Sequence, residues 1–347
     1  MENICGMVYR IYPTKAQEEQ IKKTVDGCRF VYNYFLALKT KMYQEEWKKL
    51  SFYDMAKLVP PLKEEYPLLT EVESTALIFE LKNLDRAFEG FFKKRSGYPK
   101  FRSRHADSWS FQMQNMKNRI RIEGSCIRLP KVGLVKIKLH RPVVGVIANA
   151  TVRGTADGEY YVSLCVRQEI EAKENAGGEV GVSITGEPFC AMSDGTLVER
   201  PEHWDEDLIR LAREQKKLSR KSRDSKNREK QKKKVAKLYR KIANRRKDFL
   251  HKQALSLARE NRLICMEKLP LKELMEGEGS ARTLSDAAYG EFGQMVAYKT
   301  ALHGGTLIRV PAEELDAGAP EFGAERAEQI LEIGLAAAKA EESERKK

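Results

Sequence analysis

Residues 179–198 constrain the fold most, because they read as two short strands followed by a tight turn. Three apolar residues alternate along the first strand: Val180, Val182 and Ile184. This period of two is typical of a strand with one buried face. Residues 189–192 supply a second apolar run, and residues 193–196 have the composition of a turn. Ser183 is therefore expected on the opposite face of the sheet. On these residues alone, an ordinary sheet hairpin is the favoured interpretation.

Positive charge is concentrated in residues 210–259, which hold 21 Lys and Arg against 4 Asp and Glu. The rest of the chain has 42 basic and 46 acidic residues, so this stretch carries the whole net charge of +13. The surrounding residues 205–260 predict two long helices with a bend at 222–227. Their apolar seam is thin: Leu208, Leu211, Leu218, Val235, Leu238, Ile242, Phe249, Ala254 and Leu257. Such one-sided charge favours a polyanion partner over a merely solvated helix face.

The N-terminal half combines helix and strand patterns. Residues 7–12 alternate like a strand, and Thr14 with Gln17 forms a capping box that predicts a helix over 15–47. A second amphipathic helix is expected after Thr70, because apolar residues recur at helical spacing: Leu77, Leu81, Leu84, Phe88 and Phe91. Six short strands separated by turns then predict a small barrel: 110–112, 120–122, 126–129, 135–139, 150–153 and 160–164.

The C-terminal part begins after residues 171–178, which have linker composition. Residues 263–266 predict a short buried strand that ends at Glu267, and a carboxylate in that place is a candidate active-site acid. Three further elements are expected: a helix over 284–303, a strand over 306–310 and a helix over 324–347.

A second basic region lies in residues 93–104, where six cations surround Tyr98 and Phe101 without any acidic residue. These cations are Lys93, Lys94, Arg95, Lys100, Arg102 and Arg104. Cations interleaved with aromatic rings suit phosphate neutralisation together with base stacking. Composition alone leaves a plain basic surface loop equally open.

The six cysteines are scattered and form no paired motif, so reduced thiols are expected. The sequence shows neither a secretory signal nor an apolar run long enough to span a bilayer. These features predict a cytoplasmic protein without a membrane partner.

Several short segments follow one another in a distinctive order along nearly the whole chain. They are 9–14, 29–33, 84–88, 91–92, 99–102, 180–182, 193–195, 218–221, 225–227, 241–244, 246–251, 298–299 and 304–305. Each segment alone is weak, but together they resemble the TnpB family. TnpB proteins are transposon-encoded RNA-guided nucleases, ancestral to type V CRISPR effectors.

The resemblance implies a RuvC nuclease site, which is RNase H-like and has three carboxylates. Ser183 stands at the first position and Glu267 at the second. The third position aligns with Gly323, although Asp316 or Glu321 are other possible equivalents. Carboxylates are needed because they bridge and charge-balance two cations about 4 Å apart, which a neutral hydroxyl does not do. The sequence therefore predicts a degenerate site and a protein that is not an enzyme.

The family's zinc ribbon is also missing, because residues 310–324 contain no cysteine. The expected fold class is a multidomain α+β protein, and the resemblance implies its domains. Residues 1–13 and 105–170 form a WED-like barrel, and 14–104 form an inserted helical lobe that is REC-like. Residues 179–347 form a degenerate RuvC domain that carries the helical hairpin.

The resemblance, most specifically to the TnpB-like nuclease-dead repressors (TldR proteins), also implies partners. A monomer is expected to bind a guide RNA and double-stranded DNA beside a short adjacent motif, and to repress transcription by occupying promoters. Neither zinc nor catalytic magnesium is expected. The residues expected to read the motif are Ser74, Thr75, Phe79, Lys82, Ser110 and Gln112. Those expected to bind nucleic acid on the helical hairpin are Lys216, Lys217, Arg220, Lys221, Lys226, Asn227, Asn244, Arg245, Arg246, Lys247 and His251.

Two alternatives remain open at this point. The chain is an active RNA-guided endonuclease if relocated acids, such as Glu187, Asp194 or Asp316, complete the site. It is an RNA chaperone of a transposon transcript if the basic hairpin serves RNA alone.

Overall fold

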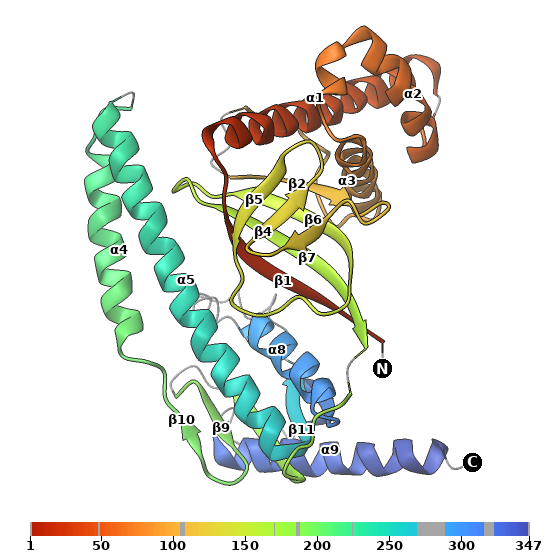
Figure 1. The fold of residues 1–347 in the computed structure, drawn as a ribbon. Coiled ribbons are helices and arrows are strands. Elements are labelled where there is room, and N and C mark those ends of the chain that lie inside the picture. The colour runs from red at the N-terminus through yellow and green to blue at the C-terminus, as the bar shows by residue number, and fades with distance from the viewer. Residues whose placement is uncertain are drawn as a thin grey trace. The chain divides into compact units, whose positions relative to one another are not determined.

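The structure is a computed structural model that describes the chain except for residues 1, 48, 105–107, 170, 185–187, 224, 269–288, 316–322 and 346–347. The chain divides into two compact units, Glu2–Glu169 and Ile170–Lys347, which combine helices and sheets as predicted (Figure 1). None of the described helices has the length and apolar character that crossing a membrane requires.

The N-terminal unit is built on one antiparallel sheet with the strand order β2-β6-β7-β1-β5-β4-β3. β1 (Glu2–Tyr12) lies at its centre, where Met7 pairs with Leu164 of β7 and Ile11 with Ile137 of β5. The other strands are β2 (Trp109–Gln114), β3 (Arg121–Glu123), β4 (Cys126–Leu129), β5 (Gly133–Lys138), β6 (Val146–Gly154) and β7 (Tyr160–Glu169). All six strands predicted for this region are present, and β2, β5, β6 and β7 are longer than predicted.

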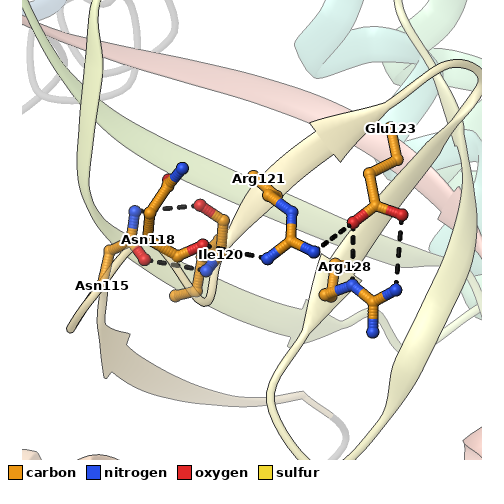
Figure 2. A network of polar contacts seen from close by, with 6 residues as sticks. All are labelled: Asn115, Asn118, Ile120, Arg121, Glu123 and Arg128. Carbon is orange, nitrogen blue, oxygen red and sulfur yellow. Dashed lines mark hydrogen bonds and ion pairs between the residues drawn. The ribbon is translucent and has the colours of Figure 1, made fainter.

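Asn115 links the two ends of this sheet. Its Nδ2 donates hydrogen bonds to the backbone oxygens of Ile120 (2.9 Å) and Ile147 (2.8 Å), and its Oδ1 accepts from Ile120 N at 2.7 Å; Figure 2 shows the two contacts with Ile120. Ile120 directly precedes β3, whereas Ile147 belongs to β6 next to the opposite edge strand. The Asn115 side chain therefore satisfies backbone groups of both segments, Ile120 and Ile147. These groups would otherwise need partners from a neighbouring strand.

Three helices are inserted between β1 and β2: α1 (Lys15–Glu46), α2 (Phe52–Glu65) and α3 (Ser74–Phe92), with a short 3-10 turn η1 (Pro67–Thr70) before α3. The predicted capping box of α1 is present, because Thr14 Oγ1 accepts from Gln17 N while Gln17 Oε1 accepts from Thr14 N. The sequence analysis missed α2. Its adjacent prolines, Pro60 and Pro61, are typical helix breakers.

α2 forms despite these prolines because tertiary packing stabilises it. Ser51 and Asp54 make a second capping box, and Met55, Val59 and Leu62 recur at helical spacing on its buried face. The three side chains join one apolar core with α1, α3 and the sheet. The burial of this face outweighs the two prolines, a case in which tertiary context overrides local propensity.

The C-terminal unit contains a mixed sheet with the strand order β10-β9-β8-β11-β12. The strands are β8 (Gly178–Ile184), β9 (Cys190–Met192), β10 (Leu197–Val198), β11 (Asn261–Lys268) and β12 (Thr306–Pro311). β8, β11 and β12 run parallel, and β9 returns antiparallel to β8. The predicted hairpin over 179–198 and the predicted strand before Glu267 are thus both confirmed.

Alternate residues of this sheet enter two separate cores. Val180, Val182 and Ile184 pack with Ile264 and Met266 against α5 (Lys226–Glu260) and α8 (Tyr289–Leu302). Leu263 and Cys265 pack instead toward α9 (Ala324–Arg345). Gly181 lies on the α9 face, where an added Cβ would stand 1.9 Å from the Ala327 oxygen. Glycine at this position therefore lets α9 approach the sheet closely.

The predicted basic hairpin consists of α4 (His203–Ser219) and α5, which lie side by side (Figure 1). Its core is as thin as the sequence indicated: Leu211, Val235, Leu238 and Ile242, with Leu218 packed against them. Ser225 caps α5 by accepting from Arg228 N, and the Arg228 guanidinium donates to the Leu218 and Lys221 oxygens. Arg228 thus closes the end of the hairpin.

Candidate functional site

Ser183 and Glu267 come together on the α9 face of the C-terminal sheet. β8 and β11 are parallel, and Val182 pairs with Met266, so the next residue on each strand is Ser183 and Glu267. Ser183 is fully buried, and its Oγ has no hydrogen-bond partner among the residues that the structure describes. Glu267 is 8% exposed. The structure therefore brings together the first two positions that the sequence analysis assigned to one site.

Arg326, in the first turn of α9, is the third side chain at this place and was missed by the sequence analysis. Its Nη2 lies 3.3 Å from Glu267 Oε1, and both residues are buried. The available signal was an arginine three residues after Gly323, at the start of a predicted helix. Because a buried carboxylate without a partner is costly, Arg326 is the group that balances the charge of Glu267.

Gly323 directly precedes α9, and its φ of 115° is a backbone conformation that favours glycine. Its backbone oxygen accepts from Ala327 N at 3.1 Å, which makes Gly323 the start of the helix. Asp194 lies in the turn after β9, where its Oδ1 accepts from Thr196 N at 2.8 Å. Glu187, Asp316 and Glu321 lie outside the described residues.

A divalent cation at this edge of the sheet would need several oxygen ligands. The described residues supply Glu267, which is paired with Arg326, and the neutral hydroxyl of Ser183. Across the described part of the chain, no cluster of three or more His, Cys, Asp or Glu side chains is placed to hold a metal ion. Ser183, Glu267 and Arg326 therefore do not fit a metal centre on their own.

The helical hairpin places many of its predicted nucleic-acid-binding residues in water. Lys216, Lys217, Arg220, Lys226, Asn227 and Asn244 are exposed, and Lys221 is half-buried. Lys217 also contacts Glu214, whose carboxylate accepts from Lys217 at 2.8 Å and lies 3.1 Å from Lys234. Hydrogen bonds from Lys217, Gln231 and Lys234 lower the pKa of Glu214 to about 2. This acid therefore holds cations of both helices in place.

Four positions near the base of the hairpin have internal roles. Arg245 pairs with the buried Asp207 at 2.7 Å, and the guanidinium of Arg246 lies 5.5 Å from the centre of the Trp204 ring. Lys247 pairs with Glu291 of α8 at 3.2 Å. His251 Nδ1 lies 3.4 Å from the Tyr298 hydroxyl, and burial, helped by nearby lysines, lowers its pKa. These contacts fasten α5 to α4 and α8.

The basic segment 93–104 follows α3 and is largely exposed. Tyr98 folds back onto the helices: its hydroxyl lies 2.8 Å from Thr40 Oγ1, and its ring meets Phe88 and Phe91 edge-on. Arg102 also turns inward, since it pairs with the buried Glu80 and lies 3.9 Å from the centre of the Tyr32 ring. Phe101 remains 65% exposed. The exposed cations here are Lys93, Lys94, Arg95, Lys100 and Arg104.

The predicted motif readers lie on two neighbouring elements. Thr75, in the first turn of α3, accepts a hydrogen bond from Gln114 N at the end of β2 (3.3 Å). Ser110 and Gln112 lie on β2, an edge strand in the described sheet. The structure thus brings α3 and β2 together.

Ser74, Lys82 and Phe79 complete the predicted set on α3. Ser74 Oγ accepts from Lys63 at 2.7 Å. Lys82 Nζ lies 5.2 Å from the centre of the Phe79 ring and 5.7 Å from that of Phe52, so it rests over two aromatic faces. All three remain candidates.

The fold and the site together define the class of protein to which this chain belongs. A mixed β10-β9-β8-β11-β12 sheet with helices on both faces is an RNase H-like arrangement, and here it carries a basic helical hairpin and accompanies an antiparallel sheet with a helical insertion. Residues 163–277 match a family model described as a probable transposase, and residues 3–48 match one described as a helix-turn-helix domain. In this chain the latter range consists of β1 and α1, one strand and one long helix.

Two relatives cover most of the chain. A protein of Streptomyces pristinaespiralis named putative RNA-guided DNA endonuclease is 33% identical over 86% of this chain and 75% of its own length. The putative RNA-guided DNA endonuclease InsQ of Escherichia coli (strain K12) is 29% identical over 90% of this chain and 81% of its own. A Cas12f1–sgRNA–target DNA complex contains a similar fold, with a TM-score of 0.60 at 10% identity, covering 95% of this chain and 98% of the solved chain. The chain belongs to the TnpB family.

The comparisons correct one prediction. The sequence analysis took the absence of an acid at two aligned positions to mean that the chain is not an enzyme. That prediction is wrong, because both relatives are named as RNA-guided DNA endonucleases. Two aligned positions are a weak basis for it, since the alignment of residues 321–327 with the family's motif is open by a few residues, and Asp316 and Glu321 lie nearby in the chain.

Proposed function

We propose that this chain binds an RNA and uses it as a guide to bind complementary DNA beside a short adjacent motif. The names of the two relatives support RNA guidance and a DNA target. The observation that carries the proposal is the helical hairpin, whose exposed cations stand on two long helices over a thin core. Such a surface neutralises phosphates without reading bases, as a protein that leaves sequence recognition to base pairing needs to do.

The adjacent motif is part of the proposal for an energetic reason. An RNA–DNA heteroduplex is about as stable as the DNA duplex that it replaces, so pairing alone gives little net drive. Protein contacts beside the target must therefore start the opening of the duplex. The neighbouring α3 and β2 offer Thr75, Ser110 and Gln112 for these contacts.

Repression of transcription follows if the target lies in a promoter, because a bound complex occupies the site that polymerase needs. The test is a reporter with a matched site at its promoter, assayed with the guide intact, the guide scrambled and the adjacent motif mutated. We expect repression in the first case alone. Repression that survives a scrambled guide would mean that the protein reads DNA itself. Tight RNA binding without DNA occupancy would support a transcript-binding protein.

The same complexes, incubated with Mg²⁺ and resolved on a denaturing gel, show whether the bound strand is cut. Glu267→Gln is the informative variant, because this carboxylate is buried beside Ser183 and Arg326. Asp194→Asn is the matched control, because that side chain caps a turn. Cleavage lost only in Glu267→Gln, in a variant that circular dichroism shows to be folded, would give this carboxylate a role in the reaction.

A further inference from the structure

Two exposed phenylalanines lie in residues 92–104, the region where α3 ends and the basic segment follows. Phe92 and Phe101 are 69% and 65% exposed, whereas every other phenylalanine that the structure describes is at least half-buried. A single exposed apolar residue is ordinary on a protein surface. Here both exposed phenylalanines of the described chain fall within ten positions, among cations and without any acidic residue. Neither the helical hairpin nor the predicted motif readers include this region.

The backbone that carries Phe101 is anchored on both sides of the ring. Before the ring, the Tyr98 hydroxyl lies 2.8 Å from Thr40 Oγ1. After it, Arg102 N donates to Asn33 Oδ1 at 2.8 Å, and Asn33 Nδ2 donates to the Arg102 oxygen at 3.1 Å. Phe101 is therefore exposed on an ordered stretch of chain, so little conformational entropy is lost when a ligand covers its ring.

Phe92 is supported by other aromatic rings. Its ring centre lies 5.4 Å from that of Phe91 and 6.3 Å from that of Phe88. Both of these rings also contact Tyr98 edge-on. Phe92 is thus the exposed end of a packed aromatic cluster, and most of its surface is open to a ligand.

Charges around the two rings show what kind of ligand they suit. Lys93 pairs with Glu89, and Arg102 pairs with the buried Glu80, so these two cations are engaged within the protein. The other four are exposed: Lys94, Arg95, Lys100 and Arg104. Lysines are depleted at the centre of protein–protein interfaces. Exposed rings among cations are instead typical of surfaces that bind single-stranded nucleic acid, where cations neutralise phosphates and rings stack on bases.

A stacking ring of this kind needs an unpaired base. Each base within a duplex is stacked on both faces, so a side-chain ring reaches a base face only on a single strand or at a strand end. When the carried RNA pairs with one DNA strand, the other strand is displaced and left unpaired.

We infer that Phe101 and Phe92 stack on bases of this displaced DNA strand, while the four exposed cations neutralise its phosphates. The inference rests on the proposed function and adds to it a site for the strand with which the RNA does not pair. The rings hold that strand without reading its sequence, because every base has a face on which a ring can stack.

Permanganate oxidation tests the stacking directly, because the reagent attacks the face of unpaired thymines and a stacked ring protects that face. The RNA-bound full chain is mixed with a matched duplex whose displaced strand is rich in thymine, and the oxidised positions are mapped. We expect a small group of displaced thymines to be protected in the wild-type complex. Phe101→Ala should expose them, whereas Phe101→Tyr, which keeps the ring, should protect them as wild type does. Tyr53→Ala, at a side chain of α2 that is 75% exposed, is the matched control.

Binding of the RNA-bound chain to single-stranded oligo(dT) gives the size of the effect. We expect Phe101→Ala to weaken this binding about fivefold or more, which is the lower end of what one stacked base contributes. Lys94→Gln combined with Lys100→Gln should lower the slope of log affinity against log salt by about 1.4, at roughly 0.7 per lost phosphate contact. Tyr53→Ala should match wild type in both measurements.

Three results would overturn the inference while leaving RNA guidance intact. Equal permanganate reactivity in Phe101→Ala and wild type would show that the ring does not stack on the displaced strand. Weaker RNA binding in Phe101→Ala, with the displaced strand unchanged, would assign the ring to the RNA. Full protection in Phe101→Leu would show that the side chain supplies only apolar surface, as a protein partner would need. If no displaced thymine becomes reactive in the wild-type complex, the duplex is not opened and the proposed function itself is refuted.

Discussion

The helical hairpin and the α9 face of the C-terminal sheet use positive charge in opposite ways. The hairpin spreads many cations in water over four buried apolar side chains, Leu211, Val235, Leu238 and Ile242. The sheet buries one cation, Arg326, against Glu267 beneath α9. On the hairpin, each single charge contributes little to stability. On the α9 face, the single charge of Arg326 decides whether the Glu267 carboxylate has a partner.

This difference follows from the surroundings of each charge. Exposed ion pairs contribute roughly 0–1 kcal/mol because water and salt screen them, so the hairpin's value lies in its summed field. Breaking a buried pair costs much more because one charge is left without a partner. Substitutions in the two regions test this contrast, from the largest expected effect to the smallest.

Replacing Arg326 by Leu should give the largest loss of stability. It leaves the Glu267 carboxylate buried without its partner, so we expect a loss of roughly 3–5 kcal/mol in the unfolding free energy of the C-terminal unit. Urea denaturation followed by circular dichroism measures it. Adding Glu267→Gln to Arg326→Leu should recover most of the loss. If Arg326→Leu alone is as stable as wild type, Arg326 does not balance the charge of Glu267.

Neutralising four hairpin cations together should change binding and leave stability nearly unchanged. We expect Lys216→Gln, Lys217→Gln, Arg220→Gln and Lys221→Gln to lower the salt slope of RNA binding by about 3, at roughly 0.7 per phosphate. Lys15→Gln, Lys22→Gln, Lys41→Gln and Lys57→Gln, exposed residues of α1 and α2, remove the same charge as a control. If the salt slope of RNA binding is unchanged in the hairpin variant, these four cations do not contact the RNA and belong to a solvated helix face.

The sequence predicted the exposed region well because its signals are local. The thin seam from Leu211 to Ile242 and the excess of lysine and arginine are both visible along the chain, and both helices formed as expected. The β8 strand was equally readable, since the alternation of Val180 and Val182 depends only on neighbouring positions. Ser183 accordingly faces away from the core that those residues enter.

What the sequence missed depends on contacts between distant segments. Arg326 meets Glu267 across 59 positions, and no local pattern announces such a pair. α2 was missed because Pro60 and Pro61 are strong local signals against a helix, while its stabilising contacts come from α3 and the turn η1. The inward turn of Arg102 was missed for the same reason, because its partner Asn33 lies 69 positions away in the chain.

Removing one apolar side chain should show how little core supports the hairpin. We expect Leu238→Ala to cost about 2–3 kcal/mol, because it deletes buried methyl groups from a core of four residues. Hydrogen exchange of the α4 and α5 amides should quicken, while exchange in β8 and β11 should not. Leu197→Ala, at a side chain that is 54% exposed, is the control. Faster exchange throughout the unit would mean that the hairpin and the sheet unfold together.

Acid should weaken the hairpin through Glu214, with the smallest effect of the four. Hydrogen bonds from Lys217, Gln231 and Lys234 lower its pKa from 4.5 to about 2. A carboxylate whose pKa is lowered by folding stabilises the folded state fully at pH values above its pKa in the unfolded chain. This contribution is lost as the pH falls from about 4.5 toward 2.

The difference in unfolding free energy between wild type and Glu214→Gln should therefore be constant from pH 7 to 5 and should shrink below about 4.5. Urea denaturation at each pH measures it, and Glu229→Gln, at an exposed acid of α5, is the control. A difference that does not change with pH would mean that Glu214 acts through packing. In that case the contacts between α4 and α5 at Glu214 would depend on burial, as the Glu267–Arg326 pair does, and not on charges that water and salt screen.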